Sequence, residues 1–228
     1  MTVVVAAHGR GRRGFRRGPL LLAAAFATVA AVTTDLAGPM RTDIRVFDPD
    51  AVARLDTEMW RAYYAKEPLP LYFELARLLR EEFHFPPLRS FVVAAHAARA
   101  AFVFQRGHDR ADYAQALPDL IAYYEAIRRV SVTPFDVKKT AELELEWWIV
   151  HRDRDPAALA RALANGAAAM YEVPADSLLE YGRLRTDAMV IRDEGGDGGR
   201  VVTESDWARI ASDLRGSWSS LARVVRPK

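Results

Sequence analysis

Residues 90–104 read SFVVAAHAARAAFVF, and this stretch decides the fold class. Its only ionisable side chains are His96 and Arg99, so a helix formed here is apolar on nearly every face. Helices with that pattern are normally buried among other elements. The stretch therefore predicts the central helix of an all-α bundle.

The flanking sequence contains further helix signals and almost no strand signal. Three helix starts are marked by Asp48-Pro49, Thr133-Pro134 and Asp155-Pro156, because the first residue caps the helix and proline fits its first turn. No alternating apolar run is bounded by hairpin turns. We expect a helical bundle of about seven to eight helices, at residues 49–66, 70–84, 88–106, 112–130, 134–152, 156–171, 175–193 and 204–225.

The last of these helices is amphipathic. Its apolar residues recur every three or four positions, which places them in one stripe made of Trp207, Ile210, Leu214, Trp218, Leu221 and Val225. Docking of this stripe on the core is the leading interpretation, with a membrane surface or a partner as alternatives. The preceding residues 194–199, EGGDGG, predict a loop because glycines lose much backbone entropy when they are fixed.

Residues 1–38 have the layout of a signal peptide or short membrane anchor. Arginines at positions 10–17 precede 17 uncharged residues and then Asp35. The apolar part is short of the roughly 20 residues of a comfortable span, so cleavage and retention both stay open. The segment Arg12-Arg13-Gly14-Phe15 also resembles the twin-arginine export motif. We expect an extracytoplasmic protein, secreted or tethered to the membrane through this segment, with residues 39–228 as one helical domain.

Charge and cysteine content exclude several classes of protein. Residues 1–45 carry seven Arg and two Asp, and the whole chain has a net charge of +2, so the remaining residues carry −3. A mildly acidic body argues against nucleic acid as a partner. The chain has no Cys, which excludes disulfides and thiolate chemistry.

Polar residues on three predicted helices are candidates for one buried cluster: Glu58, His96, Arg99 and Glu144. His96 and Arg99 lie three positions apart and share a helix face. Burying a guanidinium without an acceptor is expensive, so a carboxylate is expected opposite. A paired core network is the favoured interpretation, without a cofactor.

A metal site is the alternative interpretation. The residue types found in carboxylate-bridged iron or manganese sites of bundles occur at Glu58, Glu81, His84, His96, Glu144 and His151. Only Glu81 and His84 have the Glu-x-x-His spacing, and Glu144 and His151 are separated by about 10.5 Å of helical rise. The spacing therefore disfavours a di-metal oxidoreductase.

Aromatic residues could line a ligand pocket or fill the core, and core is favoured for Trp60, Tyr63, Tyr64, Tyr72, Tyr123, Tyr124, Trp147 and Trp148. No serine-nucleophile motif is present. The sequence therefore predicts a binding or structural role at the cell envelope, with a metal-dependent helical-bundle oxidoreductase as the alternative.

Overall fold

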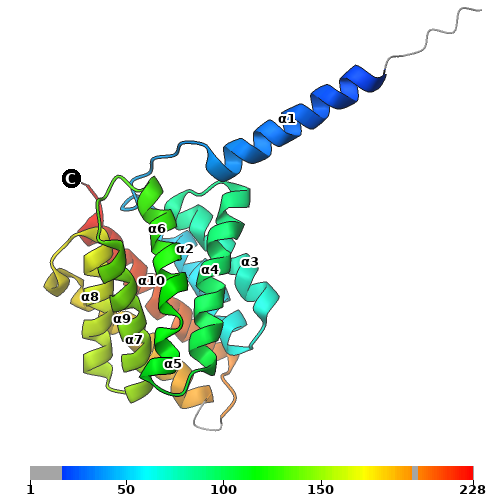
Figure 1. Cartoon of the computed structure of the whole chain (residues 1–228). Coiled ribbons are helices and arrows are strands. Elements are labelled where there is room, and N and C mark those ends of the chain that lie inside the picture. The colour runs from blue at the N-terminus through cyan, green and yellow to red at the C-terminus, as the bar shows by residue number, and fades with distance from the viewer. Residues whose placement is uncertain (1–16, 197–199, 228) are drawn as a thin grey trace, which may run out of the picture.

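The computed structural model describes residues 17–196 and 200–227 and is helical throughout (Figure 1). Within these ranges no β-strand is present, and Thr42 and Ser131 form one isolated bridge. The predicted all-α fold is confirmed. The helices are α1 (Arg17–Ala37), α2 (Pro49–Tyr64), α3 (Pro68–Phe83), α4 (Pro87–Arg106), α5 (Arg110–Ala114), α6 (Leu117–Val130), α7 (Val137–Asp153), α8 (Pro156–Tyr171), α9 (Leu179–Gly196) and α10 (Glu204–Val225), with a 3-10 turn η1 (Ala175–Leu178).

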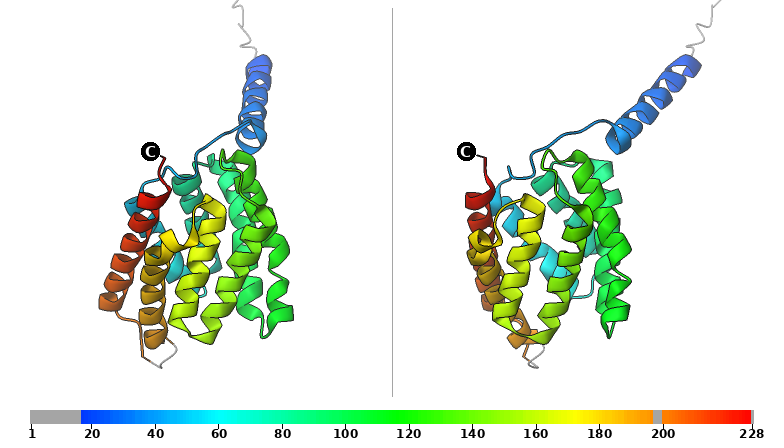
Figure 2. Two further views of the ribbon diagram at one scale, coloured as in Figure 1. Left: turned by 90° about the vertical axis from the view of Figure 1, so that its left-hand side faces the viewer. Right: turned by 60° about the vertical axis from the view of Figure 1, so that its left-hand side comes forward.

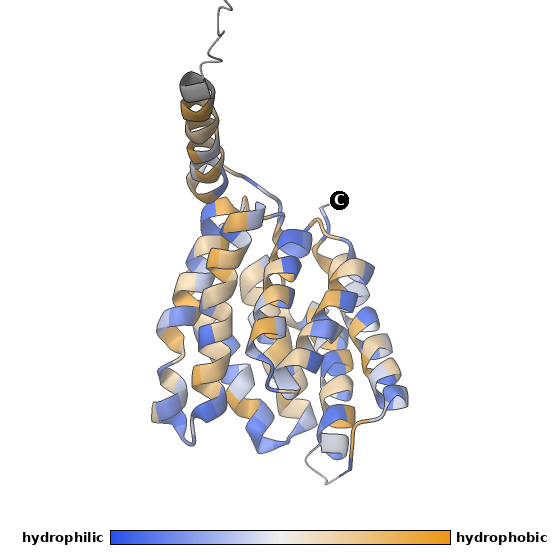
Figure 3. Cartoon of the chain, turned by 90° about the vertical axis from the view of Figure 1, so that its right-hand side faces the viewer, coloured by the Kyte–Doolittle hydropathy of each residue, from blue (hydrophilic) through white to orange (hydrophobic). Residues whose placement is uncertain are grey.

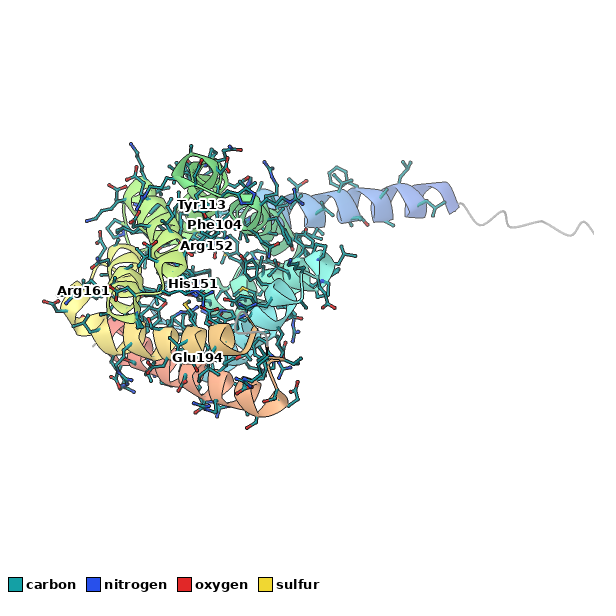
Figure 4. The ribbon with its side chains drawn as sticks, turned by 90° about the horizontal axis from the view of Figure 1, so that it is seen from below. Phe104, Tyr113, His151, Arg152, Arg161 and Glu194 are labelled. Atoms are coloured by element: carbon teal, nitrogen blue, oxygen red, sulfur yellow. The ribbon has the colours of Figure 1, made fainter. Side chains whose placement is uncertain are left out.

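Eight of these helices form a closed ring. Each of α2, α3, α4, α6, α7, α8, α9 and α10 packs on the next, and α10 returns to pack on α2. Figure 2 shows the antiparallel arrangement, and Figure 4 shows the ring from its lower end. Packed helix axes are about 8–10 Å apart, which places the axes of a round eight-membered ring about 12 Å from its centre. Inward side chains must therefore fill a wide interior, and the candidate site lies in this interior.

Local capping explains several helix boundaries. The Asp48 side chain accepts hydrogen bonds from the backbone N–H groups of Asp50 and Ala51 at the start of α2, and Asp155 caps α8 in the same way, as predicted. The start predicted at Thr133 is wrong. Asp136 caps α7 instead, accepting from Lys139 N at 3.0 Å.

Two predicted helices are interrupted in the structure. The helix expected at 112–130 is split into α5 and α6. Helix α6 has a proline in its first turn, a position where the missing backbone N–H costs no hydrogen bond, and this favours a new helix start. The helix expected at 175–193 begins as η1 and continues as α9. Helix α9 also includes Gly195 and Gly196, so the loop predicted at 194–199 is wrong for its first three residues, and residues 197–199 lie outside the described ranges.

The amphipathic helix α10 docks on the ring as expected. All six residues of its apolar stripe are buried, with relative exposures of 9% or less. A capping box starts the helix, with the Thr203 side chain and Asp206 each accepting from the other's backbone N–H.

The prediction that residues 90–104 form a central helix is wrong. Helix α4 is one member of the ring, between α3 and α6. Val92 is 54% exposed and the Arg99 side chain is 70% exposed, so one face of α4 meets solvent. Ala94 and Ala100 are fully buried, so the small apolar residues of α4 serve close packing with its two neighbours.

Helix α1 projects away from the ring, and its outward surface is largely apolar (Figures 1 and 3). Leu22 and Phe26 are 74% and 78% exposed. Only its C-terminal end is fixed, by Arg89 at the start of α4, whose backbone N–H donates to Asp35 Oδ1 and whose guanidinium donates to the carbonyls of Asp35 and Gly38. No helix among the described residues is both long and apolar enough to span a membrane.

Candidate functional site

A cavity of about 270 Å³ lies inside the helical ring, and every helix of the ring contributes to its wall. Large aromatic side chains make up much of this wall. Among the aromatic candidates identified in the sequence, those that line the cavity are Trp60, Tyr63, Tyr64, Tyr123, Tyr124, Trp147 and Trp148. Tyr72 does not, because its hydroxyl donates to the Phe91 carbonyl between α3 and α4 at 3.0 Å. The aromatic residues are thus both core and pocket wall.

Glu82 on α3 is a buried acid in the wall. Its side chain enters the cavity, and Oε1 accepts a hydrogen bond from the Tyr171 hydroxyl at 2.7 Å. Burial raises the pKa of Glu82 to about 8; the Tyr171 hydrogen bond opposes this rise, and the negative charges of Asp56 and Glu144 add to it. At pH 7, with no cation beside it, Glu82 is therefore mostly protonated.

Glu144 on α7 is a second acid in the same wall. Its carboxylate accepts from the Tyr124 hydroxyl at 3.0 Å and from the Trp148 indole at 3.1 Å. Burial raises the pKa of Glu144, and these hydrogen bonds reduce the rise. The residue nevertheless keeps some accessible surface, which is consistent with a position on the cavity. Both acids are thus held by neutral donors.

A buried ion pair between Asp56 and Arg185 joins α2 to α9 at the cavity wall. Arg185 Nη1 and the Trp218 indole both donate to Asp56 Oδ2, at 2.6 and 2.7 Å. The Arg185 guanidinium also lies 5.5–5.7 Å from the ring centroids of Trp60, Tyr181 and Trp218. Although burial opposes it, the charge of Asp56 holds the pKa of Arg185 above its usual value. The charge of this guanidinium is thus already neutralised.

The lower end of the cavity carries a polar cluster. His151 Nε2 lies 2.9 Å from Asp193 Oδ2, and Arg192 is 3.1 Å from the same carboxylate. The Arg192 guanidinium also stacks 3.6 Å from the centroid of Tyr64. Figure 4 shows His151 inside the ring, whereas Arg161 lies on its outer edge. This cluster fixes the ends of α7 and α9 beside the cavity.

The structure does not bring the four residues of the predicted polar cluster together. Glu58 lies on the outer surface of α2 and pairs with Arg54 and Arg77. His96 and Arg99 do share a face, but their common acceptor is Asp119 on α6, at 3.1 and 3.2 Å. Their face points outward because the small residues of α4, not its polar ones, fit against the ring interior. Glu144 alone reaches the cavity.

The six candidate metal ligands are similarly dispersed. His84 ends α3 and hydrogen-bonds the Val46 carbonyl at 3.0 Å, and neighbouring Glu81 does not line the cavity. His151 is paired with Asp193 at the lower end. Within residues 17–196 and 200–227, no three His, Asp or Glu side chains are grouped so that they could hold a metal ion.

Sequence reasoning missed several residues of the site, among them its three buried charged residues, Asp56, Glu82 and Arg185. A usable signal was present, because each of these residues follows an apolar or aromatic residue by four positions on its own helix: Val52 precedes Asp56, Leu78 precedes Glu82, and Tyr181 precedes Arg185. That spacing places the charged side chain on the buried face. The Glu-x-x-His spacing drew attention to Glu81 instead of its neighbour.

No protein-family model, curated protein or solved structure matches this chain.

Proposed function

We propose that this is a small-molecule-binding protein of the cell envelope, which holds its ligand in the cavity at the centre of the helical ring. The main support is the cavity itself: aromatic side chains form its wall, and its two acids, Glu82 and Glu144, accept hydrogen bonds only from neutral donors. Ligand pockets are typically apolar and aromatic with a few polar groups, and begin at volumes of about 300 Å³. A cavity of about 270 Å³ suits a compact ligand.

Energetic cost supports a binding role over a purely structural one. Close packing normally fills protein interiors, and buried carboxyl groups cost stability unless something is gained from them. Here the cavity wall contains buried Glu82 and partly buried Glu144, within one ring of helices. Groups with perturbed pKa values gather at functional sites, and Glu82 and Glu144 are such groups.

The envelope location is supported by the N-terminal segment. Basic residues precede an apolar helix, and the described part of that helix exposes Leu21, Leu22 and Phe26 without packing them on the ring. Cell fractionation tests this part of the proposal. The full chain is expected outside the cytoplasm, in solution or with the membrane, and deletion of residues 1–38 is expected to retain it inside. An unchanged distribution after the deletion would contradict the proposed location.

A cavity-filling variant tests the binding role. Ala97 on α4 lines the cavity, so Ala97→Leu places three more carbon atoms inside it. Ala208→Leu makes the same change on the exposed face of α10 and is the matched control. Thermal unfolding of the full chain is measured with a panel of small neutral, cationic and anionic organic compounds.

At least one compound is expected to raise the melting temperature of the wild type and of Ala208→Leu but not of Ala97→Leu, because ligands that bind the folded state stabilise it. A panel in which no compound distinguishes the two variants would contradict a ligand-binding cavity.

The positions of the candidate ligands disfavour a metal-dependent oxidoreductase. It required a shared site for Glu58, Glu81, His84, His96, Glu144 and His151, and the described structure disperses these residues over the surface, the helix ends and the cavity.

A further inference from the structure

We propose that the cavity selects a compact organic cation, an alkylammonium compound, with Glu82 and Glu144 as its counter-ions and the surrounding aromatic rings as its walls. This inference rests on the proposed binding function and adds the chemical class of the ligand. It follows from three observations: the charge balance of the wall, the nature of its rings, and the hydrogen bonds of the two acids.

The wall of the cavity contains more acidic groups than basic ones. Among the described lining residues, the acids are Asp56, Glu82 and Glu144, and the one permanently charged base is Arg185. Arg185 is paired with Asp56 at 2.6 Å. Two acids therefore remain for a ligand to neutralise, and a buried carboxylate is strongly favoured when a cation is placed beside it.

The aromatic walls suit the same ligand class. The faces of Trp and Tyr rings attract cations, and cages of such rings recognise ammonium groups. The protein already holds guanidinium groups in this way around the cavity: Arg185 lies over Trp60 and Trp218, and Arg192 over Tyr64. The lining rings Tyr123, Trp147 and Trp148 are beside Glu144 or one turn from it, where a bound cation would meet both features.

The hydrogen bonds of Glu82 leave it able to receive a cation. Its Oε1 accepts from Tyr171, and Oε2 forms no hydrogen bond or ion pair with the described residues. The charged or titratable groups that influence Glu82 lie on five other helices: Asp56 on α2, Tyr123 on α6, Glu144 on α7, Tyr171 on α8 and Arg185 on α9. A cation that binds beside protonated Glu82 releases its proton to solvent, so cation binding is expected to strengthen with pH.

An anionic ligand is the opposing possibility. Arg185 Nε is buried without a hydrogen-bond partner among the described residues and could donate to an anion. Such a ligand would meet no unpaired positive charge in the wall, because Asp56 already neutralises the guanidinium, and it would lie near Glu82 and Glu144, whose ionised forms would repel it. The charge balance therefore favours the cation, and an anionic probe decides between them.

Three probes of nearly equal shape but different charge test the proposal on the full chain: choline, its neutral isostere 3,3-dimethylbutan-1-ol, and the anion 3,3-dimethylbutanoate. n-Butylammonium and butan-1-ol form a second pair. Binding is measured by titration calorimetry between pH 6 and pH 8. We expect at least one cation to bind at least about tenfold tighter than its neutral counterpart.

The pH profile and two isosteric variants identify the acids. Cation affinity is expected to rise by about tenfold per pH unit below the pKa of Glu82 of about 8, whereas alcohol affinity stays constant. Glu82→Gln is expected to lose at least about tenfold in cation affinity and to abolish the pH dependence. Glu81→Gln, on the same helix but outside the cavity, should leave both unchanged. Glu144→Gln and its outward neighbour Glu142→Gln form a second matched pair.

Each other result overturns the inference in a distinguishable way. If neutral isosteres bind as tightly as the cations, or if the anion binds tightest, cation selection is wrong while the binding cavity stands. If neither cation binds, cation selection is wrong, and the cavity-filling experiment decides the fate of the binding function separately. Cation affinity that is unaffected by both Glu82→Gln and Glu144→Gln would place the cation elsewhere.

Discussion

Replacing Glu82 by Gln is expected to remove a pH dependence of stability that wild-type protein carries. The folded protein holds the Glu82 proton up to a pKa of about 8, whereas the ordinary value is 4.5. Between these values the folded state binds a proton that the unfolded chain lacks. The stabilising contribution of this proton is complete below about pH 4.5 and is lost as pH rises toward 8.

The magnitude follows from the width of that window. One bound proton gives a slope of about 1.4 kcal/mol per pH unit, so Glu82 lowers the free energy of unfolding by about 3–4 kcal/mol between pH 5 and pH 8. Gln keeps the shape of the side chain and an acceptor for Tyr171, but it has no proton to lose. Glu82→Gln should therefore gain about 3–4 kcal/mol relative to wild type over this range.

Urea unfolding of both proteins at pH 5, 6.5 and 8 measures the difference directly. Comparison with Glu81→Gln, one position away on the same helix, corrects for the pH dependence of the unfolded chain. A difference between Glu82→Gln and wild type that stays constant across this range would show that Glu82 is not held protonated, and the electrostatic description of the cavity would be wrong.

Two further predictions concern the packing of the ring. Asp56→Ala should lower the free energy of unfolding by about 3–5 kcal/mol, because it leaves buried Arg185 unpaired and removes an acceptor from the Trp218 indole. The double variant Asp56→Ala/Arg185→Met should recover part of the loss. If Asp56→Ala were as stable as wild type in urea, the buried charge pair would be contradicted. Gly182→Ala should cost about 1–3 kcal/mol because its Cβ would collide with a backbone carbonyl of α8, whereas Gly166→Ala, whose Cβ would have its nearest neighbours at 3.9 Å, should unfold near the wild-type midpoint. Equal midpoints for the two glycine variants would show that α8 and α9 are not in close contact at Gly182.

The fold class was accessible from local signals, and the ring was not. Caps such as Asp48 and Asp155 and the stripe of α10 act within one helix, so the sequence indicates them directly. Closure of the ring depends on α10 packing on α2, a contact between the two ends of the domain that no local pattern encodes.

The candidate site was only partly predictable for the same reason. Glu144 was identified correctly as inward, but His96 and Arg99 were expected to meet it. An apolar pattern rich in Ala does not distinguish a central helix from one packed closely between two neighbours, so the rotation of α4 could not be inferred. The spacing of apolar residues around Glu82 does indicate a buried face, and this signal is the one to apply in similar chains.

The indole resonances of the five tryptophans provide the most direct test of a ligand-binding cavity. Trp60, Trp147, Trp148 and Trp218 line the cavity, whereas Trp207 does not and instead lies beneath the Arg61 guanidinium. The measurement is a set of ¹H–¹⁵N spectra of the full chain titrated with n-butylammonium and with 3,3-dimethylbutan-1-ol. Binding in the cavity predicts saturable shifts of the four lining indoles with Trp207 unmoved. Shifts confined to Trp207, or four lining indoles that stay fixed with both probes, would contradict a ligand site at the centre of the ring.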